Sequence, residues 1–356
     1  MSKILEEFHK SVNNKNEKQK RNKKYLLDKK KIIINFFTKI IINIILGILE
    51  FNYCSNEYNL VKKWVKYKLN PVLGHDRNTI VFDPFVMIER NNLYRMYVSW
   101  RKPGKIALSL STDGIKWSNL RTVLEKGNSS SWESIVNRAS VLYKDGMYYM
   151  WYTGQSKRES KIGFAISKDG LSFKKLDKPV LLPEYNYEKK SVMNPHVIFD
   201  KKEKIYKMWY SAGETYEPDV IGYATSEDGI NWIKYKDNPI FIPNKNKSSL
   251  DSFKIGGCDV HKISDHLYLM FYIGYSDINT ARIFVAESKD GITNWKRSST
   301  PIIEPTKNEF DSNACYKPSA IYDKKNNKWL LWYNGRRKEK EFIGLATYNN
   351  YKIYIN

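Results

Sequence analysis

Five short segments of the chain carry the residues best suited to chemistry, and they recur at regular spacing. They are FDPFVM (82–87), NRASVL (137–142), MNPHVI (193–198), CDVHKI (258–263) and YKPSAI (316–321). Aligned on the aromatic core that follows each segment, the first column reads Asp83, Arg138, Asn194, Asp259 and Lys317. A second column lies two residues later in each segment and therefore on the same strand face. It reads Phe85, Ser140, His196, His261 and Ser319. Scaffold positions of a repeat should resemble one another, so these divergent columns predict a functional site.

The cationic members of this set suit an anionic ligand. Guanidinium, ammonium and imidazole groups gathered in one channel fit a phosphate or a similar group, and the cations expected there are Arg138, His196, His261, Lys317 and Arg336. The structural alternative is that each of them pairs with a neighbouring carboxylate. No close ligand spacing supports a metal site built from the two histidines and Asp259, so we expect no metal and no other cofactor.

The segments belong to a larger repeat that predicts the fold. Each precedes an aromatic strand core, and the cores are MYVSW (96–100), MWYTG (150–154), MWYSA (208–212), MFYIG (270–274) and LWYNG (331–335). A second apolar strand follows each core, and four of these strands lead into Ser-x-Asp-Gly turns at 111–114, 167–170, 226–229 and 288–291. Asp-Gly between apolar runs is a strong hairpin signal. Each unit thus has about four short strands, the content of one propeller blade.

The two ends of the repeat predict closure of a ring. The fifth unit ends without its Asp-Gly strand, and the missing piece occurs before the first unit. There WVKYKLNPVL (64–73) parallels WIKYKDNPIF (232–241) almost residue for residue. We therefore expect an all-β, five-bladed β-propeller in which an N-terminal strand closes the last blade.

Up–down strand order assigns the loops to two faces. The loops after the aromatic cores should lie at the mouth with the inner strands, and they carry Arg101, Gln155, Glu214, Tyr216, Asp277, Asn334 and Arg336. The Asp-Gly turns should lie on the opposite face, so their aspartates, Asp113, Asp169, Asp228 and Asp290, are interpreted as turn residues. Glu133, Asp251 and Asp311 share an apolar-acid-Ser pattern, which favours a structural role.

The combined motifs resemble those of the five-bladed β-propeller glycosidase superfamily. The resemblance rests on Asp83-Pro84, the MWYxG cores, IGYATSxDGxxW and the final YKPSxIYD…WYNGR, and it covers residues 64–350. The group includes arabinanases, invertases, levansucrases and mannoside phosphorylases. In this family an Asp on the first inner strand is the catalytic base or nucleophile, and Asp83 matches it.

The resemblance implies a pair of carboxyl groups, one at the anomeric carbon and one at the leaving oxygen. Asp83 is predicted for the first role, and Asp259 or Glu214 for the second. Predicted substrate-binding residues are Arg138, Asn194, His196, His261, Tyr316, Lys317 and Arg336. Arg138 and Asn194 stand in columns where the resemblance implies further acids, which disfavours simple hydrolysis.

The N-terminal part differs in composition from the repeat. The chain has 356 residues and a formal net charge of +22, and residues 1–69 hold 16 Lys or Arg against 6 Asp or Glu. We expect a basic flexible tail (1–31), an amphipathic or membrane-anchoring helix (32–55) and the propeller (56–356). Asn35, Lys39 and Asn43 recur every four residues within the apolar stretch 32–51, which favours a helix lying on a membrane surface over one that spans it. A helix packed on the main domain is a further alternative.

Composition and motifs together restrict the function. We expect a cytoplasmic enzyme, peripheral to the inner face of the membrane, that cleaves or transfers a glycosyl residue of a glycan or sugar phosphate. An anchored helix would instead place the domain outside. The alternatives are a membrane-associated glycosyltransferase in polysaccharide biosynthesis, with a phosphorylated donor such as a phosphoribosyl donor, and a non-catalytic sugar-binding propeller. Nucleic-acid binding is not expected, because much of the excess charge lies in the tail. Sugar identity, linkage and stereochemical outcome stay open.

Overall fold

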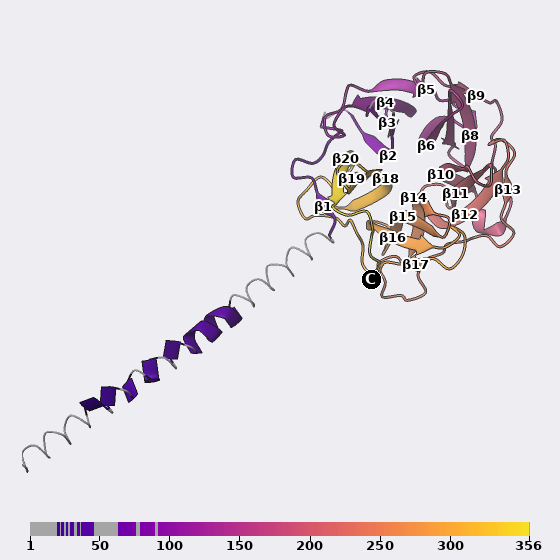
Figure 1. Cartoon of the computed structure of the whole chain (residues 1–356). Coiled ribbons are helices and arrows are strands. Elements are labelled where there is room, and N and C mark those ends of the chain that lie inside the picture. The colour runs from indigo at the N-terminus through magenta and orange to yellow at the C-terminus, as the bar shows by residue number, and fades with distance from the viewer. Residues whose placement is uncertain are drawn as a thin grey trace, which may run out of the picture. The chain divides into compact units, whose positions relative to one another are not determined.

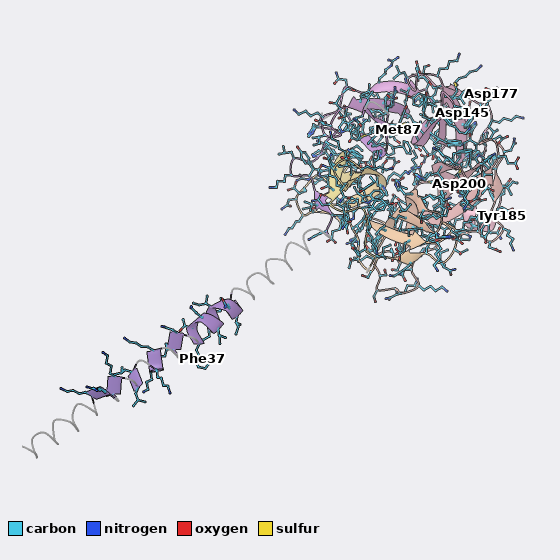
Figure 2. The ribbon with its side chains drawn as sticks, viewed as in Figure 1. Phe37, Met87, Asp145, Asp177, Tyr185 and Asp200 are labelled. Atoms are coloured by element: carbon cyan, nitrogen blue, oxygen red, sulfur yellow. The ribbon has the colours of Figure 1, made fainter. Side chains whose placement is uncertain are left out.

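The chain divides into two compact units, Met1–Val61 and Lys62–Asn356, and each is described by itself. A computed structural model describes residues 63–75, 79–89 and 92–355, together with 20–45 except 22, 25, 28, 32, 33 and 36. In the first unit the described residues between 20 and 45 are helical and exposed, so the helix extends into the segment predicted as a tail. Phe37 is labelled on this helix in Figure 2. No helix within the described part of the chain has the length and apolarity that a membrane span requires.

The second unit is built from antiparallel groups of four strands. The first group has β2 (Val81–Ile88), β3 (Tyr94–Trp100), β4 (Lys105–Ser111) and β5 (Arg121–Leu124). The second has β6 (Ile135–Lys144), β7 (Met147–Gln155), β8 (Ser160–Ser167) and β9 (Lys174–Lys175). The third has the short helix η1 (Asn186–Glu188) before β10 (Ser191–Asp200), β11 (Ile205–Gly213), β12 (Pro218–Ser226) and β13 (Ile233–Lys234).

Two further groups complete the series. The fourth has β14 (Lys254–Ser264), β15 (Leu267–Tyr275), β16 (Ala281–Ser288) and β17 (Lys296–Arg297). The fifth has β18 (Ala314–Asp323), β19 (Lys328–Arg337) and β20 (Lys340–Tyr348), and its outer strand is β1 (Val65–Lys66). The first strand of each group contacts the first strands of both neighbouring groups, so β2, β6, β10, β14 and β18 form a closed ring. Figure 1 shows these five strands toward the centre of the unit.

The predicted closing strand pairs where the repeat requires it. Val65 lies opposite Thr347 and Lys66 opposite Ala346, so the N-terminal strand completes the last group. Asn70 exchanges two hydrogen bonds with the backbone of Leu345, of 2.8 and 2.9 Å. Asn238 makes the same pair with Tyr223 in the third group. The parallel between 64–73 and 232–241 is therefore a parallel of structure as well as of sequence.

The aromatic cores join neighbouring groups. In each of four groups the core aromatic donates to the glycine carbonyl of the next group's Asp-Gly turn, at 2.8–3.1 Å: Tyr97 to Gly170, Trp151 to Gly229, Trp209 to Gly291 and Trp332 to Gly114. The last of these bonds joins the fifth group to the first. Each turn aspartate accepts hydrogen bonds from its own turn, which confirms the structural reading of Asp113, Asp169, Asp228 and Asp290.

A buried tyrosine–acid–base cluster recurs in four groups. A core tyrosine donates to a carboxylate that is also paired with a base on the outermost strand. The clusters are Tyr152–Glu133–Lys175, Tyr210–Glu188–Lys234, Tyr272–Asp251–Arg297 and Tyr333–Asp311–Lys66. The structural role predicted for Glu133, Asp251 and Asp311 is confirmed. Side chains fill the space between the ribbons, and Asp177 and Tyr185 lie toward the circumference (Figure 2).

Candidate functional site

One residue in every inner strand interrupts the pairing with the next strand and adopts a left-handed backbone. The φ angles are 51° for Asp83, 57° for Arg138, 51° for Asn194, 38° for Gly257 and 30° for Lys317. Each of these residues lies inside a register shift between the inner strand and the following one. A non-glycine residue in this conformation costs about 1–2 kcal/mol. Strain repeated at four non-glycine positions is typical of a functional site.

The bulges show that the alignment predicted from the sequence is wrong by two residues in the fourth segment (258–263). Gly257, not Asp259, is the equivalent of Asp83 and Arg138, because the shift in β14 falls between Gly256 and Asp259. The hydrogen bonds agree with this alignment: Ser99 accepts from the Arg138 amide, and Ser211 accepts from the Gly257 amide, both at 2.8 Å. A side chain at Gly257 would meet Ile273 Cδ1 at 2.6 Å. The sequence alignment matched the Asp and the His and could not detect that a glycine occupies the bulge.

Asp259 is instead equivalent to residues whose side chains connect one inner strand to the next. Its equivalents Ser140 and Ser319 each accept a backbone N–H of the next inner strand, from Val197 at 3.0 Å and Val86 at 2.9 Å. Asp259 accepts the Ala320 N–H at 2.5 Å in the same way. Its side chain therefore performs a structural task, and it is absent from the lining of the cavity described below.

The two histidines predicted for substrate binding lie with Asp259. His196 Nδ1 and His261 Nε2 are each 3.1 Å from a carboxylate oxygen of Asp259. Burial alone would raise the pKa of Asp259, but the two imidazoles and the Ala320 N–H outweigh it and hold that pKa well below its usual range. Lys317 is buried and donates to the Cys258 carbonyl oxygen at 3.2 Å. His196, His261 and Lys317 do not line the cavity, so the five predicted cations do not converge there.

A cavity of about 2370 Å³ is lined mainly by the inner strands and the loops that follow the aromatic cores. It brings together six of the ten predicted site residues, which are Asp83, Arg138, Asn194, Glu214, Tyr316 and Arg336. It contains 11 Lys or Arg side chains and 6 Asp or Glu side chains. Pockets for small molecules are typically about 300–1,000 Å³, so this cavity has room for an extended ligand.

Asp83 and Arg138 form an ion pair inside the cavity. Arg138 Nε lies 3.1 Å from Asp83 Oδ2, and both side chains are largely buried. The bulges of β2 and β6 hold the two residues on neighbouring strands. Asp83 thus has a neutralising partner before any ligand binds, and the guanidinium keeps further N–H groups for one.

Two carboxyl groups of the cavity, Glu217 and Glu341, were not predicted from the sequence. Burial raises the pKa of Glu217, and the charge of Asp83 raises it further, against the hydrogen bond from Tyr275 and the charges of Arg138 and Arg336. Tyr275 Oη lies 2.7 Å from Glu217 Oε2. Burial also raises the pKa of Glu341, which is paired with Arg101. Glu217 lies in the connection between β11 and β12, which differs between units, and Glu341 is the second residue of β20, outside the columns compared in the sequence.

Glu214, the acid predicted in the same loop as Glu217, has a different environment. Half of its side chain is exposed, and it pairs with Lys189 at 3.1 Å. The Glu214 carboxylate is thus held in a half-exposed salt bridge. Among the acids of this loop, Glu217 is therefore better suited to donate a proton.

Several buried polar atoms in the wall of the cavity have no hydrogen-bond partner among the residues that the structure describes. They are Asn137 Oδ1, Asn194 Oδ1, both side-chain atoms of the Asn334 amide, and Arg336 Nε. Unsatisfied buried polar atoms are costly, and a ligand rich in hydroxyl groups would satisfy them. Within the described residues no group of three or more His, Cys, Asp or Glu side chains has the arrangement of a metal site.

Comparison with known proteins identifies the family. The sequence profile of glycosyl hydrolases family 43 matches residues 69–338. A 1,2-beta-oligomannan phosphorylase of Thermoanaerobacter sp. (strain X514) is 30% identical over 203 residues, which are 54% of this chain and 62% of that enzyme. The beta-1,2-mannobiose phosphorylase of the same organism is 28% identical over 174 residues, covering 44% and 52%. The chain thus matches less than two thirds of the length of either relative.

A solved structure shares the fold. It comes from work on the GH130 family of mannoside phosphorylases, which contains glycoside hydrolases that target beta-1,2 mannosidic linkages in Candida mannan. The TM-score is 0.63 at 18% identity, over 83% of this chain and 96% of that one. The predicted relation to the propeller glycosidase superfamily is confirmed. With more than two thirds of its length matched by the profile, the chain belongs to glycosyl hydrolases family 43.

Proposed function

We propose that this chain is a five-bladed propeller enzyme that cleaves a β-mannosidic bond by phosphorolysis, with inorganic phosphate as the attacking group. The observation that carries the proposal is the Asp83–Arg138 pair, 3.1 Å apart. A guanidinium beside the carboxylate disfavours activation of a water molecule and favours binding of an anion. The two phosphorylase relatives, both enzymes of β-1,2-mannosides by name, support the same choice.

Each residue of the proposed reaction has one task. Arg138 and Arg336 bind phosphate oxygens beside the anomeric carbon, and the Asp83 carboxylate stabilises the positive charge that develops on the sugar ring. Glu217, whose pKa is raised mainly by burial, gives its proton to the leaving oxygen. The glycosidic C–O bond breaks as a C–O bond to phosphate forms. The hydroxyl proton of the attacking hydrogen phosphate then returns to Glu217, so the products are a glycosyl phosphate and a shortened glycan.

The unsatisfied amides support the sugar half of the proposal. Asn194 and Asn334 offer buried atoms without partners, which suit the hydroxyl groups of the sugar held over Asp83. A sugar-binding propeller without catalysis would not require a carboxyl group of raised pKa at the same place. We therefore favour an enzyme over a sugar-binding propeller without catalytic activity.

Transfer from a phosphorylated sugar donor is the second candidate. It uses the same groups, with the phosphate as leaving group and an acceptor hydroxyl as attacking group. The 11 basic side chains of the cavity favour it, because the donor carries more charge than a neutral glycan. This candidate retains the location expected above, at the inner face of the membrane.

The test is to incubate the full chain with β-1,2-mannobiose and longer β-1,2-mannosides, with and without phosphate. We expect mannose 1-phosphate to form at a rate that saturates with phosphate. Free mannose released at one rate regardless of phosphate would contradict phosphorolysis. A parallel incubation with sugar phosphates, including phosphoribosyl donors, and glycan acceptors would reveal transfer as an extended acceptor.

A further inference from the structure

The cavity has cations that the reaction proposed above does not use. Five of its 11 basic side chains pair with carboxylates. In the part of the chain that the structure describes, the other six have no carboxylate at ion-pair distance, and all of them except Arg336 are unused by the proposed reaction: Lys126, Lys157, Arg158, Lys190, Arg336 and Lys338. Three of these six, Lys157, Arg158 and Lys190, come from two adjacent loops at the edge of the cavity. These three residues are called the basic rim below.

The loops of the basic rim are tied to one another by buried hydrogen bonds. Ser160 N donates to Lys190 O at 3.3 Å and to Ser191 Oγ at 3.1 Å. The Thr215 hydroxyl donates to Arg158 O at 3.3 Å and accepts from Ser191 Oγ at 3.1 Å. Ser160, Ser191 and Thr215 are all buried. The backbone therefore holds Arg158 and Lys190 close together despite their mutual repulsion.

The same hydrogen bonds connect the basic rim to the proposed proton donor. Thr215 lies two residues before Glu217 in the connection between β11 and β12. Gln155, at the end of β7, donates to Thr215 O at 3.5 Å, so β7 and this connection also meet. A glycan whose scissile bond lies at Glu217 therefore has the basic rim within reach along this part of the wall. The volume of about 2370 Å³ leaves space for sugar units beyond the one that reacts.

We propose that the basic rim binds negatively charged groups on the outer part of the glycan, so that the substrate is an acidic oligosaccharide carrying carboxylate or phosphate groups. This inference rests on the proposed function for the position of the reacting sugar. Other lysines close to the basic rim have carboxylate partners. Lys161 pairs with Glu159, and Lys189 pairs with Glu214 and Asp219. Among the described residues the basic rim has no such partners, and an anionic ligand would supply the missing charge.

The test measures binding, without turnover, to the full chain. Three labelled tetrasaccharides are titrated by fluorescence anisotropy: an oligogalacturonate, a mannan fragment with phosphate groups, and neutral mannotetraose. The variant is Lys157→Gln, Arg158→Gln, Lys190→Gln. Its matched control is Lys168→Gln, Lys174→Gln, Lys178→Gln, which removes the same charge from exposed lysines of the second group that do not line the cavity.

We expect at least one charged probe to bind tenfold or more tightly than mannotetraose, with an affinity that falls as salt is added. The rim variant should lose that preference, and the control variant should keep it. Which charged probe binds identifies carboxylate or phosphate as the recognised group. Equal affinity for charged and neutral probes, or equal loss in both variants, would overturn the inference. Rim-dependent binding without phosphorolysis would instead count against the proposed function alone.

Discussion

At the scale of single residues, the charge balance at Asp83 decides which reaction is favoured. The Asp83 carboxylate lies 3.1 Å from the Arg138 guanidinium, which balances its charge. The same guanidinium is a good ligand for phosphate. The carboxyl group that we propose as the proton donor, Glu217, comes from the connection between β11 and β12.

We predict that Asp83→Asn and Arg138→Ala impair different steps. Asp83→Asn removes the charge that stabilises the transition state and should lower kcat about 10²–10⁴-fold with little change in sugar binding. Arg138→Ala removes charge-assisted hydrogen bonds of about 1.5–3 kcal/mol, so KM for phosphate should rise roughly 10- to 150-fold. Initial rates at varied phosphate and varied glycan measure both. Full activity of Asp83→Asn would exclude Asp83 from the site.

The raised pKa of Glu217 predicts a pH dependence. The group must be protonated to act as an acid, so activity should be complete below its folded-state pKa and fall as pH rises through it. Because burial and Asp83 raise that pKa, the fall should occur above the usual carboxyl range. The profile of kcat/KM against pH measures this.

In Glu217→Gln this alkaline decline should disappear along with most of the activity. Glu214→Gln, in the same loop, is the matched control and should keep both the rate and the profile. A profile that is unchanged in Glu217→Gln would assign the proton to another group, with Glu341 as the next candidate.

From the sequence, the residues at the bulges of the inner strands were easier to predict than the second carboxyl group of the candidate site. Divergence among repeated positions found Asp83, Arg138 and Asn194, because strand spacing fixes those positions in every unit. It placed Asp259 wrongly, because the bulge at Gly257 shifts the register by two residues. It missed Glu217, which lies in a connection whose length the repeat does not constrain, and Glu341, which lies in β20 outside the columns that were compared.

At the scale of elements, the outermost strand of each group is short and relies on side chains to hold it. β9, β13, β17 and β1 have two residues each, and each contributes a base to a buried tyrosine–acid cluster. Lys66 performs this task for the fifth group, at 2.6 Å from Asp311. The ring is therefore closed by a buried ion pair as well as by backbone bonds.

Removing the base from this cluster should destabilise the second unit. Lys66→Met leaves the Asp311 carboxylate buried without its cation, and breaking such pairs costs about 3 kcal/mol. The exposed neighbour Lys68→Met is the control and should change stability by less than about 0.5 kcal/mol. Urea unfolding followed by tryptophan fluorescence measures both variants. Equal urea midpoints for the two variants would show that the Lys66–Asp311 ion pair contributes little to the stability of the second unit.

Truncation tests the same element more severely. Deleting residues 1–55 should leave the thermal stability of the second unit unchanged, whereas deletion through Leu73 removes β1 and the bonds of Asn70. The longer deletion should lower the midpoint or abolish folding. Identical thermal midpoints for the two truncations would contradict closure by the N-terminal strand.

At the scale of the whole molecule, the repeat made the fold predictable. Five aromatic cores, four of them followed by Asp-Gly turns, implied antiparallel groups of four strands. The segment 64–73, which supplies the strand missing from the fifth unit, implied closure of the ring. Each of these features is a short motif that can be recognised in the sequence. The first unit offered no such repeat. Its described residues between 20 and 45 are helical, and residues 46–62 of the predicted helix and domain boundary lie outside the described residues.

We predict that the first unit binds anionic membrane surfaces through its lysines and the apolar residues of 32–51. The full chain should sediment with vesicles of anionic lipid, and salt should weaken the binding because exposed charges are screened. The chain without residues 1–55 should stay in the supernatant. Extraction that needs detergent and resists salt would instead indicate a spanning helix, and equal sedimentation of both forms would contradict the prediction.

The most direct test of phosphorolysis follows the oxygen atoms. The full chain is incubated with β-1,2-mannobiose and phosphate labelled with ¹⁸O at all four positions, and the products are analysed by mass spectrometry and ³¹P NMR. If phosphate attacks the anomeric carbon beside Asp83 and Arg138, mannose 1-phosphate will retain all four labelled oxygens, including the bridging one. Free mannose as the sole sugar product, with the labelled phosphate unchanged, would contradict the account.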